Sequence, residues 1–417
     1  MDAPTPPSDN EKGIGFRVPA PPARPGEDPD FANFDKGAPG DIPRFAVDAP
    51  VDAFTPYHQK ILRVLSDHGQ AEGPWAGGID DAEKKAALVN MIRTRAFDQR
   101  MMRAQRQGKT SFYIQCLGEE AIGTGAALST NITDMHFPTY RQQSILLTRN
   151  IDPERMMNQI YSNEQDSLKG KQLPVLYSFR EAGFFTLSGN LATQWAQGVG
   201  WAMASAIRKD DKVAVAWIGD GATAEGDWHW GNLFAAVYRA PCLLCVVNNQ
   251  WAISSTNAFA GGDLNSFAAR LASYGLPALR VDGNDVLAVV AACRFAVQRA
   301  RMGLGAVGIE FVTYRGGAHS TSDDPTKYRP KDELSAWPLG DPIERLKQHL
   351  IVSDVMSAEE IAIEEKAADT EMREAERRAE AHGLVHDGRG ASPATMFDQV
   401  YEELPGRLIE QQDDAGF

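Results

Sequence analysis

Two short apolar runs in the middle of the chain constrain its fold more than any other feature. Residues 213–218 and residues 242–247 are apolar throughout. A strand with one face in water alternates apolar and polar residues, whereas a continuous run is typical of a parallel strand buried on both faces. Residues 225–239 lie between the two runs and suit a crossover helix. The segment therefore predicts a strand–helix–strand unit in a parallel sheet.

A second unit of the same kind follows. Residues 279–282 and 308–314 have the composition of strands, and residues 286–301 between them suit a helix. The middle of the chain, from residue 108 to about residue 315, is therefore predicted to form one parallel α/β sheet.

Helices are predicted on both sides of this region. Residues 80–107 are rich in Ala, Met, Leu and Arg, and Gly108 is a suitable stop for that helix. Ser357 and Glu360 form a capping-box pattern, and the charged segment that they open runs to His382. We expect this last helix to be solvated or to dock on another surface.

The N-terminal segment has a different composition. Eleven of the 24 prolines fall in the first 50 residues, where neither a helix nor a central strand can be sustained. We predict an extended arm over residues 1–55, an α/β domain over 56–340 and a helical C-terminal region over 341–417 that packs on the same domain. Simple disorder of the arm stays open, but its apolar residues are spaced as if it wraps over a surface: Ile14, Phe16, Phe31, Phe34 and Phe45.

The overall composition excludes several classes of protein. The 417 residues include 42 Lys and Arg against 56 Asp and Glu, a net charge of -14, which argues against nucleic acid or an anionic membrane as the main partner. The longest apolar run, residues 286–293, is far short of the ~20 residues that span a bilayer.

Four cysteines are too few for a disulfide scaffold, and we expect Cys242 and Cys245 to pack in the core. With no secretory signal, a cytoplasmic location is expected, or the mitochondrial matrix for a eukaryotic source.

Polar motifs follow both apolar runs directly. Gly-Asp-Gly occupies residues 219–221 and Asn-Asn occupies residues 248–249, so Asn249 lies 30 positions after Gly219. The carboxyl ends of neighbouring parallel strands meet at one edge of the sheet, where ligands bind. The Asp220 carboxylate, the Asn249 amide oxygen and the Trp251 carbonyl are hard oxygen ligands that suit Mg²⁺ holding a diphosphate. The glycines let the backbone approach phosphate oxygens.

This pair of motifs resembles the thiamin diphosphate motif, which begins with Gly-Asp-Gly and ends with Asn-Asn. A lone Gly-Asp-Gly is most often an ordinary turn, so the pairing carries the argument. We identify neither a P-loop nor the Gly-x-Gly-x-x-Gly fingerprint of a dinucleotide fold. The resemblance implies the thiamin diphosphate-binding fold, an α/β fold with a parallel sheet flanked by helices, and thiamin diphosphate and Mg²⁺ as cofactors.

The resemblance extends over roughly residues 55 to 410, to the α subunits of the thiamin-dependent decarboxylase component of 2-oxo acid dehydrogenase complexes. The first and the last of the matching segments look most like the branched-chain, or 2-oxoisovalerate, branch of that family. The segments are Ser111-Phe-Tyr-Ile114, Gly118-Glu-Glu120, Thr139-Tyr-Arg141, Leu191-Ala-Thr-Gln194, Asn248-Asn249 and His319-Ser-Thr-Ser-Asp-Asp324.

The resemblance implies a set of site residues. Tyr140 and Arg141 would contact the diphosphate, where a guanidinium forms strong charge-assisted hydrogen bonds. Leu191 would support the bent cofactor from the start of a helix over residues 192–209. The implied cofactor-binding residues are Phe112, Tyr113, Tyr140, Arg141, Ser188, Gly189, Leu191, Gly219, Asp220, Gly221, Ala222, Asn249, Trp251 and His319; the metal ligands are Asp220, Asn249 and Trp251; the catalytic residues are His319 and Tyr140.

His319 follows a glycine-rich stretch in a polar loop that we expect to be mobile. An imidazole that titrates near neutrality can donate a proton or a hydrogen bond to the diphosphate or to the reaction intermediate. The next residue, Ser320, matches a serine that is phosphorylated in animal relatives, whereas the second such position is Pro330. A monovalent cation is a further possible cofactor, through Ser188, Asn190, Thr193 and Gln194.

The reaction implied by the resemblance is decarboxylation of a branched-chain 2-oxo acid and transfer of the acyl group to a lipoyl arm. The carboxylate that activates the cofactor belongs to a separate β subunit in this family, so we expect the chain to be inactive alone. The expected partners are that β subunit, in an α₂β₂ heterotetramer, and a lipoyl transacylase core. Three alternatives stay open: a pyruvate or acetoin dehydrogenase α subunit, a non-catalytic cofactor-binding subunit, and a nucleotide-binding dehydrogenase.

Overall fold

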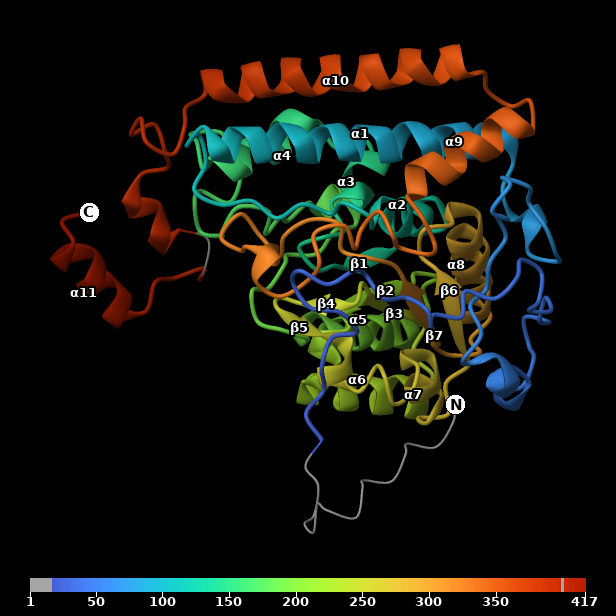
Figure 1. Cartoon of the computed structure of the whole chain (residues 1–417). Helices are drawn as coiled ribbons and strands as arrows, with labels where there is room; N and C mark the ends of the chain where they lie inside the picture. Colours follow the sequence, from blue (N-terminus) through green and yellow to red (C-terminus); the bar gives the residue numbers. More distant parts are fainter. Residues whose placement is uncertain (1–16, 399–400) are drawn as a thin grey trace, which may run out of the picture.

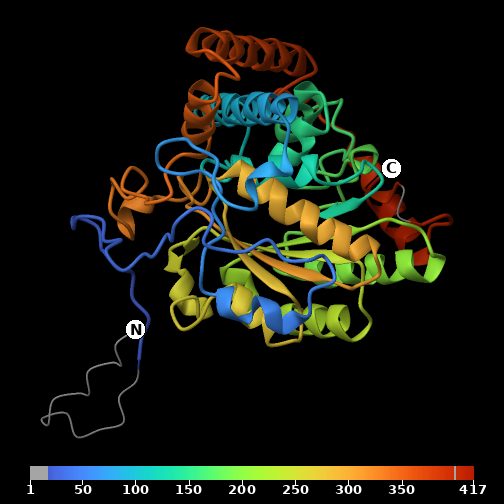
Figure 2. The same cartoon turned by 90° about the vertical axis from the view of Figure 1, so that its right-hand side faces the viewer.

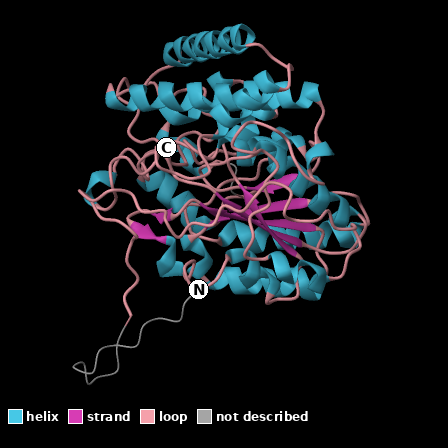
Figure 3. Cartoon of the chain, turned by 45° about the vertical axis from the view of Figure 1, so that its right-hand side comes forward, coloured by secondary structure: helices cyan, strands magenta, loops and turns pink. Residues whose placement is uncertain are grey.

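A parallel sheet of five strands forms the centre of the computed structural model, which describes residues 17–398 and 401–417 (Figures 1 and 3). The strand order is β1-β2-β3-β7-β6, and every neighbouring pair is parallel. Both predicted strand–helix–strand units are therefore confirmed, and so is the α/β fold class. The strands are β1 (Met135–Phe137), β2 (Ala214–Gly219), β3 (Cys242–Asn248), β6 (Ala278–Asp282) and β7 (Val307–Val312), and a separate antiparallel pair consists of β4 (Trp251–Ala252) and β5 (Ser255–Thr256).

Helices cover both faces of the sheet, and the inner strands β2 and β3 are apolar on both faces. Val215 and Trp217 of β2 belong to one buried cluster with residues of α1, α2 and α8, whereas Ala216 and Ile218 belong to another with residues of α5, α6 and α7. Figure 1 shows these two groups of helices on opposite sides of the sheet. The helices are α1 (Asp81–Arg106), α2 (Glu120–Leu128), α3 (Ser144–Thr148), α4 (Pro153–Tyr161), α5 (Thr193–Arg208), α6 (Gly226–Val237), α7 (Phe267–Ala272), α8 (Val286–Arg301), α9 (Pro342–Val352), α10 (Ala358–Ala381) and α11 (Gly406–Asp414).

Short 3-10 helices occupy several connections. They are η1 (Val51–Tyr57), η2 (Ala76–Gly78), η3 (Arg180–Ala182), η4 (Gly221–Ala224), η5 (Asn257–Ala260), η6 (Pro325–Lys327) and η7 (Pro393–Phe397). One connection needs a correction to the sequence analysis. Gly303, Gly305 and Gly308 do have the spacing of a dinucleotide fingerprint, but the first two connect α8 to β7 and Gly308 lies within β7, whereas that fingerprint leads from a strand into a helix.

The two predicted long helices are confirmed by their caps. Asp80 caps α1 and Ser357 caps α10, each in a reciprocal capping box with Glu83 or Glu360. α10 packs on α1 and α4 and forms the outermost layer of the molecule (Figure 1). Ion pairs such as that of Arg93 with Glu371, at 2.7 Å, join α1 to α10. This charged helix is therefore docked along one face.

The described part of the N-terminal arm lies on the body of its own chain (Figure 2). Residues 17–50 form no helix or strand, as their proline content requires. Phe31 and Phe34 pack against Trp337, with ring centroids 5.3 and 4.8 Å away, and Phe45 packs against Phe54. These contacts agree with an arm that wraps over a surface. Ile14 and Phe16 lie outside the described residues.

The remaining expectations from composition concern cysteines and membranes. Cys242 and Cys245 are fully buried on β3 and face opposite layers of the core, as expected. Within residues 17–398 and 401–417, none of the helices is both long and apolar enough to span a bilayer.

The arm is predicted to contribute to stability through its aromatic contacts. Phe34→Ala removes a half-buried ring from Trp337, and we expect the free energy of unfolding to fall by about 1 to 2 kcal/mol. Urea unfolding of both proteins measures this difference. Val18→Ala is the matched control, because Val18 lies in the same arm but is exposed. Equal stabilities of Phe34→Ala and the control would contradict the docking of the arm.

Candidate active site

A cavity of about 340 Å³ lies at the edge of the sheet where β2 and β3 end. It collects almost all of the side chains that the sequence analysis had assigned to cofactor binding. The predicted residues that line it are Tyr140, Arg141, Ser188, Gly189, Leu191, Gly219, Asp220, Gly221, Ala222, Asn249, Trp251 and His319. Residues from five separate segments of the chain therefore meet at one place.

Strand register brings the two polar motifs together. Gly219 of β2 is paired with Val247 of β3, and the Asp220 N–H donates to the Val247 carbonyl at 3.1 Å. The backbone then turns so closely past the β4 hairpin that a Cβ on Gly221 would lie 2.3 Å from the Ala252 Cβ. Gly221 is therefore required by the close approach of two backbones.

The predicted metal ligands present oxygens to this region. The Asp220 Oδ1 accepts from the Gly221 N–H at 2.7 Å, whereas its Oδ2 is buried and has no hydrogen-bond partner within the described part of the chain. The Asn249 Oδ1 accepts from the Trp251 N–H at 3.2 Å, and the Trp251 carbonyl accepts from Arg315 at 3.2 Å. Burial raises the pKa of Asp220 to about 6. A buried carboxylate oxygen without a partner fits a site for a cation.

Any cation bound here depends on amide, carbonyl and phosphate oxygens as well as on Asp220. The described residues contain no group of three or more His, Cys, Asp and Glu side chains that could hold a metal. One carboxylate with neutral oxygens suits Mg²⁺, which takes one or two carboxylates together with the phosphates of its ligand. The residues present therefore fit Mg²⁺ with a diphosphate.

Arg141 supplies the buried positive charge of the cavity. Its guanidinium donates to the backbone carbonyls of Gln115 and His319, the latter at 2.7 Å, and its Nε lies 3.9 Å from the Glu119 carboxylate. The side chain is 4% exposed. These contacts fix a guanidinium in the wall of the cavity, where it favours an anionic ligand.

Glu119 is a site residue to which sequence reasoning gave no role. Its side chain is buried in the wall of the cavity, and its Oε1 accepts from the Asn249 Nδ2 at 2.7 Å. Burial raises its pKa to about 7, against the opposing effects of Arg141 and the Asn249 hydrogen bond. The Gly118-Glu-Glu120 segment was a signal for this residue, since it matched the family.

His319 lies in the cavity wall beside Tyr140, and its ring is edge-on to the tyrosine ring at 5.7 Å. Burial, and then the charges of Arg141 and Arg315, lower the pKa of His319 to about 3. The expectation that this imidazole titrates near neutrality is therefore wrong for the structure described here. Its Nδ1 lies 3.2 Å from the Arg141 guanidinium, which can only donate, so the proton of the neutral ring is on Nε2.

Phe112 and Tyr113 do not line the cavity. The Tyr113 hydroxyl is fully buried and donates to Asp98 at 2.6 Å. Its backbone instead holds the loop that carries His319, because Tyr113 and Thr321 exchange two hydrogen bonds of 3.0 Å. The assigned contact of these two aromatic residues with the cofactor stays a prediction, and the structure gives this segment a supporting position.

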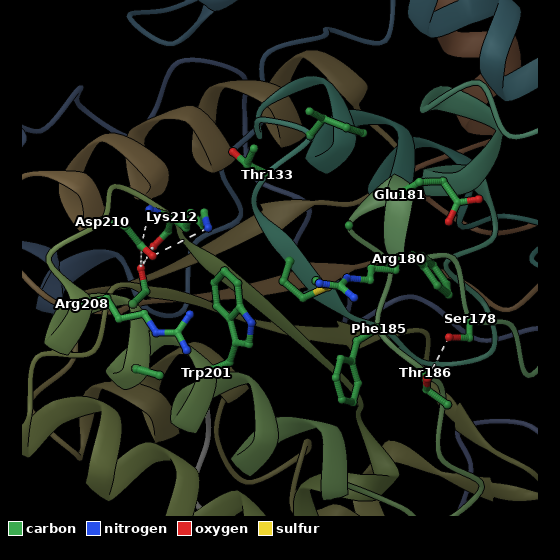
Figure 4. A pocket seen from close by; sticks show the side chains of 16 residues that line it. Thr133, Ser178, Arg180, Glu181, Phe185, Thr186, Trp201, Arg208, Asp210 and Lys212 are labelled. Atoms are coloured by element: carbon green, nitrogen blue, oxygen red, sulfur yellow. Dashed lines mark hydrogen bonds and ion pairs between the residues drawn. The ribbon is translucent and has the colours of Figure 1, made fainter. Parts of the chain in front are cut away.

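A larger hollow of about 730 Å³ lies near the edge strand β1 (Figure 4). Arg180, Trp201 and Arg208 are among its lining residues. Its Asp210 carboxylate is already bonded to Ser205 and lies 3.8 Å from a lysine. None of the site residues predicted from the sequence lines this hollow, so the smaller cavity is the candidate active site.

The pKa of His319 predicts a pH dependence of stability. Because this pKa is about 3 in the folded protein and about 6.5 in the unfolded chain, the unfolded chain takes up the proton first as the pH falls. His319 therefore lowers the free energy of unfolding progressively from about pH 6.5 downward. Urea unfolding at about pH 7 and about pH 5 should show a smaller loss for His319→Gln than for the wild type. His68→Gln, which changes an exposed histidine, should behave as the wild type; equal losses in all three proteins would contradict the assignment.

Comparison with known proteins places this site in a family. Residues 89–386 match the family described as "Dehydrogenase E1 component". The chain is 51% identical over 403 residues to the 2-oxoisovalerate dehydrogenase subunit alpha of Pseudomonas aeruginosa. The aligned region covers 97% of this chain and 98% of that relative. It is 37% identical over 356 residues to the mitochondrial 2-oxoisovalerate dehydrogenase subunit alpha of Homo sapiens, covering 85% and 78% of the two chains. The chain belongs to the dehydrogenase E1 component family.

Proposed function

We propose that this chain is the α subunit of a thiamin diphosphate-dependent 2-oxo acid dehydrogenase that decarboxylates branched-chain 2-oxo acids and transfers the acyl group to a lipoyl domain. The observation that carries the proposal is the meeting of Asp220 and Asn249 at the ends of adjacent strands, in a cavity that also contains the buried Arg141. The relatives from Pseudomonas aeruginosa and Homo sapiens are both named 2-oxoisovalerate dehydrogenase subunit alpha, which supports the branched-chain substrate class.

Bound thiamin diphosphate would supply a carbon nucleophile for the keto group and an electron sink for the decarboxylation. Asp220, Asn249 and the Trp251 carbonyl would hold Mg²⁺, and Arg141 would neutralise phosphate charge. His319, neutral and protonated on Nε2, offers a hydrogen-bond donor to an anionic group in the cavity. In this proposal these residues bind and orient the cofactor.

The mouth of the cavity supports the proposal of a partner subunit. Leu191 lines the cavity and is nevertheless 54% exposed, and Gly189 and Asn190 beside it are exposed as well. A β subunit that covers this edge would bury Leu191 and supply the carboxylate that activates the cofactor. The proposed assembly is an α₂β₂ heterotetramer that acts with a lipoyl transacylase core, located in the cytoplasm.

A monovalent cation is part of the same proposal. The Asn190 carbonyl already accepts from Thr193 at 3.3 Å, and the Gln194 Oε1 is buried with no hydrogen-bond partner in residues 17–398 and 401–417. Ser188 contributes a hydroxyl that accepts from the Asn190 N–H at 3.1 Å. These oxygens lie together at the start of α5 and would suit K⁺ or Na⁺.

The substrate class is tested by expressing the chain with its β subunit. We expect decarboxylation that requires both thiamin diphosphate and Mg²⁺. We expect 2-oxoisovalerate to be preferred over pyruvate, because the relative from Pseudomonas aeruginosa is named a 2-oxoisovalerate dehydrogenase subunit. A spectrophotometric assay of 2-oxo acid-dependent reduction of an artificial electron acceptor measures it. Preference for pyruvate would keep the chemistry and refute the substrate class. Cofactor binding without turnover of either acid would favour a non-catalytic subunit.

The metal assignment is tested by Asp220→Ala in the same assembly. We expect the substitution to abolish Mg²⁺-dependent binding of thiamin diphosphate, because it removes the carboxylate with the unpaired buried oxygen. Calorimetric titration of thiamin diphosphate with and without Mg²⁺ provides the measurement. Asp211→Ala is the matched control, since it removes an exposed carboxylate from the same region of the chain. Retained Mg²⁺-dependent binding in Asp220→Ala would refute the assignment.

A further inference from the structure

We infer that Glu119 is a positioning residue that fixes the orientation of the Asn249 side chain, so that the amide oxygen of Asn249 faces the proposed metal position. The inference rests on the proposed function, because it concerns how this chain prepares a ligand for Mg²⁺. It adds a residue from a separate segment, 130 positions away from Asn249, to the machinery of the site.

The geometry around Glu119 is fixed by the backbone. Glu119 immediately precedes α2, and its N–H donates to the Cys116 carbonyl at 2.8 Å. Its side chain is 2% exposed, and one carboxylate oxygen accepts from the Asn249 Nδ2 at 2.7 Å. Arg141 provides the nearest positive charge, with its Nε 3.9 Å from the same oxygen. One carboxylate oxygen is therefore bonded before any ligand binds, whereas the other, Oε2, is buried and has no hydrogen-bond partner among the described residues.

A carboxylate selects one of the two orientations of an asparagine amide. The oxygen and the NH₂ of an amide occupy nearly the same space, so packing alone does not distinguish them. Arg141 and the hydrogen bond from Asn249 oppose the effect of burial and favour the ionised form of Glu119. An ionised carboxylate accepts hydrogen bonds and does not donate them, so it places the NH₂ of Asn249 on its side. The Asn249 oxygen is then directed away from Glu119, where the Trp251 N–H donates to it at 3.2 Å.

The neighbouring asparagine provides a natural comparison. Asn248 also donates its NH₂ to a buried carboxylate, the Oε1 of Glu310 at 2.8 Å. Successive residues of a strand point to opposite faces, and Glu310 also accepts from the Ala268 N–H of α7, on the face away from α2. The cavity is lined by Glu119 and Asn249 but by neither Asn248 nor Glu310. Two chemically similar pairs thus lie on opposite sides of the sheet, at the last residue of β3 and at the residue after it, and only one of them faces the site.

The first test is Glu119→Gln in the chain assembled with its β subunit. A glutamine presents either an oxygen or an NH₂ to Asn249, so the orientation of the metal ligand is no longer determined. We expect the affinity for Mg²⁺, titrated at saturating thiamin diphosphate, to fall by about 10- to 100-fold, the range typical of groups that orient metal ligands. Calorimetry follows the binding, so the readout does not depend on turnover.

A reciprocal exchange separates positioning from general damage to the fold. In Asn249→Asp, two carboxylates face each other, and we expect weaker Mg²⁺ binding. In the double variant Glu119→Gln with Asn249→Asp, the NH₂ of the introduced glutamine donates to the new carboxylate, whose second oxygen is available to the metal. We expect the double variant to bind Mg²⁺ more tightly than either single variant, because the two substitutions together restore a hydrogen bond between residues 119 and 249.

Glu310→Gln is the matched control, since it changes the carboxylate of the equivalent pair on the opposite face. We expect it to keep the Mg²⁺ affinity of the wild type, even where its urea unfolding shows a loss of stability. Unchanged Mg²⁺ affinity in Glu119→Gln would overturn the inference, and so would an equal loss in Glu310→Gln or the absence of recovery in the double variant. A wild-type assembly that binds no thiamin diphosphate with Mg²⁺ would instead remove the proposed function itself, and the inference with it.

Discussion

The parallel pairing of β2 with β3 is the contact on which the rest of the site depends. Its register sets Gly219 beside Val247, so the two polar motifs leave the sheet at the same place. A shift by one residue would turn Asn249 to the opposite face and bring Asn248 toward the cavity, because side chains alternate along a strand. The close packing of individual side chains of both strands against the helices on either side resists such a shift. The apolar runs therefore determine the geometry of the site as well as the core.

Three ionisable groups of the cavity, Asp220, Glu119 and His319, shift in the direction that burial dictates. The pKa values of Asp220 and Glu119 are raised to about 6 and about 7, and that of His319 is lowered to about 3. Each shift favours the neutral form of the group. A divalent cation opposes the first two shifts, and a diphosphate opposes the third. A ligand that brings both signs of charge therefore suits this cavity better than one that brings a single sign.

Much of the fold was predictable from the sequence because the decisive signals are local. Continuous apolar runs identified β2 and β3, and the capping residues Asp80 and Ser357 located the starts of two long helices. The strand order, with β6 at the edge and β7 beside β3, depends on packing between distant segments and has no local signal. The pKa of His319 escaped prediction for the same reason, since it depends on burial by residues far away in the chain.

The site divides into residues that face the ligand and residues that hold them, and sequence resemblance does not separate the two groups. Tyr113 belongs to a segment that matches the family, but its side chain bonds Asp98 and its backbone anchors the loop of His319 through Thr321. Glu119 belongs to another matching segment and lines the cavity. Its carboxylate accepts a hydrogen bond from Asn249, a proposed metal ligand. Both act through hydrogen bonds between segments distant in sequence. The geometry of those bonds, rather than the match of a motif, decides which substitutions alter binding and which alter only the support of the loop.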